Sequence, residues 1–172
     1  MKIYLTNNAT VLASMRPKPS AETQACAGPG LVLSIMRWPR RDLGEAGAGR
    51  VLAFTPPRGL ALPAIRAKKG AGLDVDGAAE AWRGYEEALR WIWSKTEDRF
   101  APGVLSYGEL VDRDGLPWDG ERWRSLGVVP DGATLVCACS RAAAAAGRCH
   151  RVIAADFLRR AGWSVVLDGR VI

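Results

Sequence analysis

Three segments near the carboxyl end of the chain decide its fold: ATLVCAC (133–139), CHRVIAADFLRR (149–160) and WSVVL (163–167). The first and third are short apolar runs, which are typical of buried strands. The middle segment repeats apolar residues at helical spacing, and Gly162 follows it as a helix-ending residue. A strand, a helix and a strand in this order predict a β–α–β unit, and therefore a parallel strand pair with a right-handed crossover.

Further strands are predicted in the first third of the chain. Residues 3–6 form a short β-type run that ends at the turn signal Asn7-Asn8. Residues 31–36 and 51–55 are two more short apolar runs, and each is followed by proline within three residues. Residues 16–30 are rich in proline, glycine, serine and alanine, so we expect a loop there.

The longest predicted helix runs from about Gly77 to about Asp98. Its apolar residues recur at steps of three and four and so form one face, which comprises Ala81, Trp82, Tyr85, Ala88, Leu89, Ile92 and Trp93. Two caps and one i,i+4 ion pair are expected to support it, namely Asp74, Asp76 and the pair Glu86–Arg90. Residues 101–132 are rich in glycine and proline, and we expect an irregular, insertion-like segment there, with one helical turn near residues 120–126.

Length and composition indicate one folded unit. The chain has 172 residues, 48% of them hydrophobic, and a net charge of +6. We therefore predict a single α/β domain over residues 1–172, with a small, mostly parallel, Rossmann-like sheet flanked by helices. No run approaches the roughly 18 apolar residues of a membrane span, and no apolar signal core follows Met1. These features predict a cytoplasmic protein with no membrane partner.

The cysteines cluster with the only histidine. Of the four cysteines, three lie at positions 137, 139 and 149, and the sole histidine is His150. Cys26 lies apart, and the sequence assigns it no role. Clustered cysteines in a cytosolic chain point to metal or thiol chemistry more than to a disulfide framework. Cys137 and Cys139 fall at the carboxyl end of a predicted strand, which is where α/β proteins place their ligands.

One interpretation is a thiolate and anion site. A cysteine at a helix amino terminus beside arginines has a lowered pKa, and the same helix end binds anions. The candidate catalytic residues are Cys149, His150 and Cys137, and the candidate phosphate-binding residues are Arg148, Arg151 and Arg37. Arg37 enters from the first 70 residues, which carry 11 basic and 3 acidic residues. This interpretation predicts an enzyme or binder related to nucleotides or nucleic acids.

A second interpretation is a metal site. The set Cys137, Cys139, Cys149 and His150 has the Cys₃His composition found in tetrahedral zinc sites. Its spacing is unusual, because Cys149 and His150 are adjacent. Adjacent residues at the start of a helix point about 100° apart, so these two could bind the same ion only if they lay in a loop. The chain would then be a metal-stabilised or structural module that binds an acidic or nucleic-acid partner through its basic face. A third alternative also stays open, in which these residues only pack in the core.

The same residues resemble a known family. The carboxyl-terminal pattern is similar to that of the family called domain of unknown function 488, and it is carried by Leu135, Val136, Cys137, Cys149, His150, Arg151, Ala155, Leu158, Gly162 and Val165. Residues 3–6, 32–35 with Arg37, and 54–56 are similar to its phage and bacterial members. The resemblance implies a Rossmann-like α/β fold and a polar site around Cys137, Cys149, His150 and Arg151, but no particular reaction. Family members often carry an acidic residue where this chain has Cys139.

Overall fold

The structure is a computed structural model of the chain, and it describes all residues except 16, 37–48, 58, 61–74, 109–124 and 140. The predicted roles of Arg37 and Asp74 fall outside the described residues. Asp76 lies inside the long helix, in a part whose side chains are not described.

The described residues form an eight-stranded sheet in one α/β domain, with strand order β5-β4-β3-β2-β6-β1-β7-β8. The strands are β1 (Lys2–Asn7), β2 (Val32–Ser34), β3 (Gly49–Arg50), β4 (Ser106–Gly108), β5 (Ser125–Val128), β6 (Ala133–Cys137), β7 (Ser164–Leu167) and β8 (Arg170–Val171). The pairs among β3, β2, β6, β1 and β7 are parallel, whereas β4, β5 and β8 join in antiparallel pairs. The predicted α/β class is therefore confirmed, and the parallel arrangement holds for the centre of the sheet.

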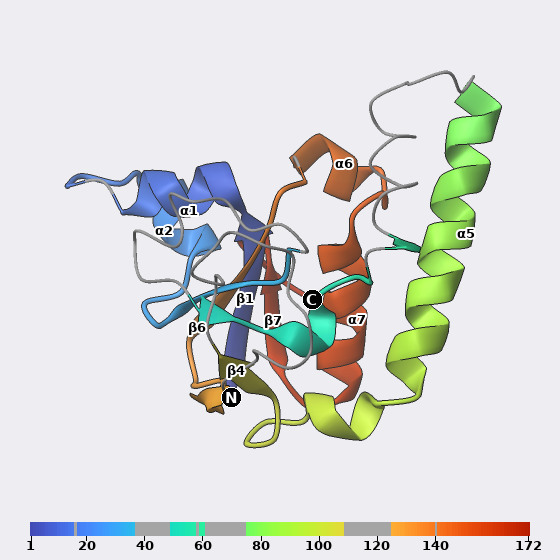
Figure 1. Cartoon of the computed structure of the whole chain (residues 1–172). Helices are drawn as coiled ribbons and strands as arrows, with labels where there is room; N and C mark the ends of the chain where they lie inside the picture. The colour runs from blue at the N-terminus through green and yellow to red at the C-terminus, as the bar shows by residue number, and fades with distance from the viewer. Residues whose placement is uncertain (16, 37–48, 58, 61–74, 109–124, 140) are drawn as a thin grey trace, which may run out of the picture.

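Helices cover both faces of this sheet (Figure 1). They are α1 (Asn8–Ser14), α2 (Ala21–Cys26), α5 (Val75–Ser94), α6 (Arg141–Ala145) and α7 (His150–Arg160), with 3-10 helices η1 (Leu52–Phe54) and η2 (Glu97–Phe100). Helices α1 and α2 contact β1, and α7 contacts β1, β6 and β7. Helix α5 packs on the outer side of α7, so it forms a further layer beyond the sheet.

The predicted β–α–β unit is present as β6, α7 and β7, but its two strands are not neighbours. Strand β1 lies between them and pairs with both in parallel. Ile3, for example, is opposite Ala133 of β6 and opposite Val165 of β7. An apolar strand buried on both faces accepts two parallel neighbours, and no local pattern shows which strand will take the central position.

Several local predictions were wrong, and the cause is visible in each case. Asn7 does not make a turn: its Oδ1 accepts a hydrogen bond from the Thr10 amide at 2.9 Å and caps α1. Helix α2 lies in the segment predicted as loop, where the Ser20 side chain caps it. The apolar run 51–55 is mainly the 3-10 helix η1 rather than a strand.

Two further features concern the segments around β6. The arginine- and alanine-rich stretch between β6 and α7 contains the short helix α6, in keeping with the high helix propensity of alanine. The segment 101–132 supplies β5 at one edge of the sheet and its neighbour β4. Residues 125–128 are extended, so the helical turn predicted near 120–126 does not continue there.

An aromatic cluster holds α5 and α7 together. The ring of Phe54 lies 5.1 Å from that of Trp93 and 4.5 Å from that of Phe100. Phe157 of α7 meets Trp93 and Phe100 edge to face, with centroid distances of 5.8 Å for both pairs. The indole of Trp163 donates to the Phe100 carbonyl at 2.7 Å. These rings are almost fully buried, so the cluster fixes the position of α7 and of the residues at its start.

Candidate thiol and metal site

The site lies at the carboxyl edge of the central strands. Cys137 is the last residue of β6, and Cys149 is the amino-terminal cap residue of α7. Cys139 follows β6 by two residues. A parallel sheet collects its strand ends at one edge, so the chain turns there and brings these segments together. We call Cys137, Cys139 and Cys149 the cysteine cluster.

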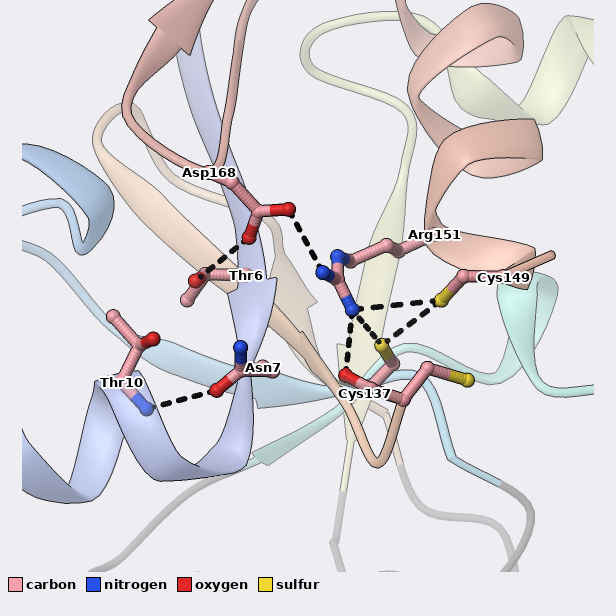
Figure 2. A network of polar contacts seen from close by, with 8 residues as sticks. Thr6, Asn7, Thr10, Cys137, Cys149, Arg151 and Asp168 are labelled. Carbon is pink, nitrogen blue, oxygen red and sulfur yellow. Dashed lines mark hydrogen bonds and ion pairs between the residues drawn. The ribbon is translucent and has the colours of Figure 1, made fainter. Parts of the chain in front are cut away.

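The three sulfur atoms of the cysteine cluster all lie within 4.8 Å of one another. The Sγ atoms of Cys137 and Cys149 are 3.3 Å apart (Figure 2). Both of these thiols are completely buried, whereas Cys139 is half-buried. None of the three forms a disulfide, and this spacing lets them share one metal ion.

Arg151 lies against the cysteine cluster inside the protein. Its side chain is completely buried, and Nη1 donates to Cys137 Sγ at 3.1 Å and to Cys149 Sγ at 3.5 Å. The same nitrogen donates to the Cys139 carbonyl at 2.8 Å. Figure 2 shows these contacts fanning out from one end of the guanidinium group. Arg151 therefore acts as a buried cation beside the sulfurs, and we find it engaged with protein groups rather than facing solvent.

Asp168 holds the other end of the guanidinium group. Its Oδ2 accepts from Arg151 Nη2 at 2.8 Å, and its Oδ1 accepts from the Thr6 hydroxyl at 3.1 Å (Figure 2). Asp168 has a φ of 48°, a left-handed conformation that aspartate tolerates better than most residues. Asp168 directly follows β7, and Thr6 belongs to β1. The carboxyl ends of these two strands therefore orient the Arg151 side chain of α7.

His150 is buried beside the cluster, and its Nε2 lies 3.1 Å from the backbone oxygen of Ile35. A carbonyl only accepts, so Nε2 carries a hydrogen in this contact. Within the described residues, the group that could hold one metal ion comprises the three cysteines without His150. The predicted Cys₃His set is thus reduced to three thiols, and the imidazole remains a neighbour of Cys139, whose pKa it helps to lower.

The pKa values of the three thiols shift in different directions. Burial raises the pKa of Cys137 to about 11, and burial likewise raises the pKa of Cys149 far above its ordinary value. Hydrogen bonds from Cys137 and Cys149 lower the pKa of Cys139. The sequence predicted the lowered pKa at Cys149. The complete burial of Cys149 raises its pKa in spite of the helix amino terminus, and the pKa is lowered at the less buried Cys139 instead.

Helix α5 contributes a residue that the sequence did not assign to the site. Tyr85 was predicted as part of an apolar helix face, and it is indeed 8% exposed. Burial raises the pKa of its phenol well above the usual range, and the charges of Cys139, Cys149 and Cys137 raise it further. The Tyr85 hydroxyl is therefore electrostatically coupled to all three thiols. No spacing rule could have revealed this, because α5 and the cysteines are far apart in the chain.

Two of the arginines predicted to bind phosphate remain, Arg148 and Arg37. Arg148 is exposed at the start of α7, next to Cys149, and Arg37 lies outside the described residues. The structure joins Cys137, Cys149 and Arg151 as expected. It adds Asp168 and Thr6, to which the sequence assigned no role in the site.

Comparison with known proteins adds no assignment, since no family model, curated protein or solved structure matches the chain. The similarity to the domain of unknown function 488 therefore stays a prediction. Among the described helices, none has both the length and the apolar character required to cross a membrane. Fold and site together define an α/β protein with three clustered thiols at the carboxyl edge of its sheet.

Proposed function

We propose that the protein binds one zinc ion through Cys137, Cys139 and Cys149 and keeps the fourth coordination position for water or a substrate. The observation that carries this proposal is the convergence of three sulfurs within 4.8 Å. Two zinc–sulfur bonds of about 2.3 Å at a tetrahedral angle separate their sulfurs by about 3.8 Å. The sulfur spacing in the cluster brackets this value, so binding needs only small side-chain rotations.

The donor set supports zinc over hard cations. Thiolates are soft ligands that select zinc, copper(I) or iron–sulfur clusters, whereas magnesium and calcium require oxygen ligands. Three thiolates and one Zn²⁺ leave one negative charge, and Arg151 lies 3.1 Å from Cys137 Sγ as its counter-cation. Hydrogen bonds to ligand atoms from an outer shell are a regular feature of metal sites.

The number of thiols supports an exchangeable fourth ligand. Structural zinc sites usually have four protein ligands, while catalytic sites have three and an open position. His150 interacts with Cys139 and is an acid–base group beside the cluster. The proposed class is therefore a zinc-dependent enzyme or binder in which His150 donates or accepts a proton.

Metal analysis of the reduced, purified protein tests this function. The expected result is one zinc per chain, with strong sulfur-to-metal charge-transfer absorption when cobalt(II) replaces it. Cys139→Ser should lose most of the bound metal, and the matched control Cys26→Ala, which removes the cysteine outside the cluster, should retain it. A wild-type protein that binds less than a tenth of an equivalent under these conditions would refute the proposal.

A second candidate function is binding of a nucleotide or nucleic acid, and the exposure of Arg148 supports it. Arg148 directly precedes Cys149, the amino-terminal cap residue of the eleven-residue helix α7. Such a helix end with an adjacent arginine suits a phosphate group. Binding of ATP or of single-stranded DNA should weaken with salt and should fall in Arg148→Ala. Equal, salt-independent signals for both proteins would dismiss this candidate.

A further inference from the structure

We propose that the cysteine cluster is a site of reversible oxidation by hydroperoxides, in which Cys139 reacts first and the oxidation then passes to a Cys137–Cys149 disulfide. The inference goes beyond the proposed zinc site and does not require it. It rests on two structural facts: the exposures of the three sulfurs differ, and the distances between them are short.

The solvent exposure of the three cysteines differs, and it determines which sulfur a hydroperoxide reaches first. Cys137 and Cys149 are completely buried, so a hydroperoxide dissolved in water does not reach them directly. Cys139 is half-buried and lies after the end of β6, at the edge of the sheet. Oxidation of thiols follows access to solvent as well as thiolate character. Among the described cysteines, Cys139 is the one in the cluster that solvent reaches.

The short distance between the sulfurs of Cys137 and Cys149 indicates which disulfide is the final product. The Sγ atoms of Cys137 and Cys149 are 3.3 Å apart, and a disulfide bond measures about 2.05 Å. The two residues come from different elements, the end of β6 and the start of α7, so their side chains meet across a short gap. A bond between them closes a loop that the fold already holds nearly shut.

The chemistry proceeds in three balanced steps. The sulfur of Cys139 attacks the terminal oxygen of the hydroperoxide, the O–O bond breaks, and a sulfenic acid and an alcohol result. The thiol of Cys149 then attacks the oxidised sulfur of Cys139, which forms a disulfide and releases water. Finally, Cys137 attacks Cys149, the Cys137–Cys149 bond forms, and the Cys139 thiol is regenerated. In total two thiols lose two hydrogens, and one hydroperoxide becomes an alcohol and water.

Arg151 favours the last step. Its Nη1 contacts the sulfur of Cys137, which attacks in this step, and the sulfur of Cys149, which is attacked, so a cation stabilises the negative charge of the attacking thiolate. When zinc occupies the cluster, the disulfide removes two of its three ligands, and the ion is released. Oxidation of the cluster and release of the metal are therefore one event in the loaded protein.

The test uses full-length protein that has been reduced and freed of metal, so that it does not depend on the zinc proposal. The protein is treated with a small excess of hydrogen peroxide, and the remaining thiols are alkylated and mapped by mass spectrometry. We expect an intramolecular Cys137–Cys149 disulfide, with Cys26 and Cys139 still alkylated, and full recovery of thiols with dithiothreitol. Cys139→Ser should slow the loss of thiols at least tenfold, while Cys26→Ala should react as the wild type does.

Three results would overturn the inference: a Cys139→Ser protein that oxidises at the wild-type rate, disulfides between separate chains as the main product, or thiols that remain intact. Cys139 is not part of a strand or helix, so this variant is expected to fold, and its circular dichroism checks this. A zinc release assay on loaded protein is run separately. A protein that forms the disulfide but never binds zinc would refute the proposed function and leave this inference standing.

Discussion

Arg151 and Asp168 form a buried ion pair, with 2.8 Å between Nη2 and Oδ2, that ties the start of α7 to the end of β7. The arginine is fully buried and the aspartate is 19% exposed at its side chain. The other terminal nitrogen of the guanidinium group, Nη1, donates to the sulfurs of Cys137 and Cys149, so this ion pair sets the position of the cation beside the cysteine cluster. The site therefore depends on a residue, Asp168, that touches none of the thiols in the described contacts.

Replacing Asp168 by alanine should destabilise the protein strongly, because it leaves the charge of Arg151 buried with no carboxylate. We expect a loss of about 3 kcal/mol in the free energy of unfolding. Urea denaturation of the wild type and the variant measures this. Asp156→Ala is the matched control, since its carboxylate is 33% exposed and its ion pairs should contribute less than about 1 kcal/mol. Equal losses for the two variants would contradict the structural role of the buried pair.

Two tryptophans on α5 should differ sharply in their contribution to stability. Trp93 is 1% exposed and packs against Phe54 and Phe157, whereas Trp91 is 65% exposed. Trp93→Ala should cost about 4 kcal/mol, because it opens a large cavity between α5 and α7. Trp91→Ala, which removes the same side chain from the same helix, should cost less than about 1 kcal/mol. Thermal unfolding of both variants checks the contrast, and a larger loss for Trp91 would show that the helix is packed differently.

The ion pair between α5 and α7 should give the stability a dependence on acid pH. Partial burial opposes the charge of Asp156, but the hydrogen bond from Arg90 outweighs it and lowers the pKa of this carboxyl. A lowered folded-state pKa means that the stabilisation is complete above the unfolded pKa of about 3.9 and is lost as the pH falls through the folded value. Asp156→Asn should therefore be less stable than the wild type at pH 7, by about 0.5 kcal/mol.

The same difference should shrink as the pH falls through the lowered folded-state pKa of Asp156, because protonation then removes the carboxylate from the wild type. Guanidinium chloride, as a salt, would screen the ion pair, so denaturation with urea at a series of pH values is the suitable measurement. Glu87→Gln removes an exposed carboxylate of α5, the helix that carries Arg90, and is the control. A difference between wild type and Asp156→Asn that persists unchanged to pH 2 would argue against this pair.

Removing the metal should lower the unfolding temperature of the loaded protein. A ligand that binds only the folded state adds about 2.7 kcal/mol when its free concentration is 100 times its dissociation constant. A chelator that outcompetes the cluster should abolish this gain, and added zinc should restore it. Magnesium at the same concentration should have no effect, because thiolates bind it poorly. Calorimetric scans that coincide with and without the chelator would mean that no ion is held by the folded protein.

Much of the sheet could be predicted from the sequence, because the period of apolar residues is a local property. Strands β1, β2, β6 and β7 and helices α5 and α7 all follow from runs and spacings, and the Glu86–Arg90 pair is found as expected at 2.9 Å. The insertion of β1 between β6 and β7 was missed. Strand order depends on packing between segments more than a hundred residues apart in the chain, and no local pattern carries it.

The candidate site divides in the same way. Clustering along the chain revealed Cys137, Cys149 and Arg151, since all three belong to one β–α connection. Asp168 and Tyr85 escaped notice because folding alone brings them to the cysteines. The direction of the pKa shift at Cys149 was also missed, because it depends on complete burial, which a position at a helix start does not reveal.

The central claim, that three thiols hold one metal ion, is tested most directly by X-ray absorption at the zinc edge of the purified, reduced protein. The account predicts three sulfur neighbours at about 2.3 Å and one lighter neighbour at about 2.0 Å. Zinc surrounded only by nitrogen and oxygen, or a protein that carries no zinc after incubation with it, would contradict the claim.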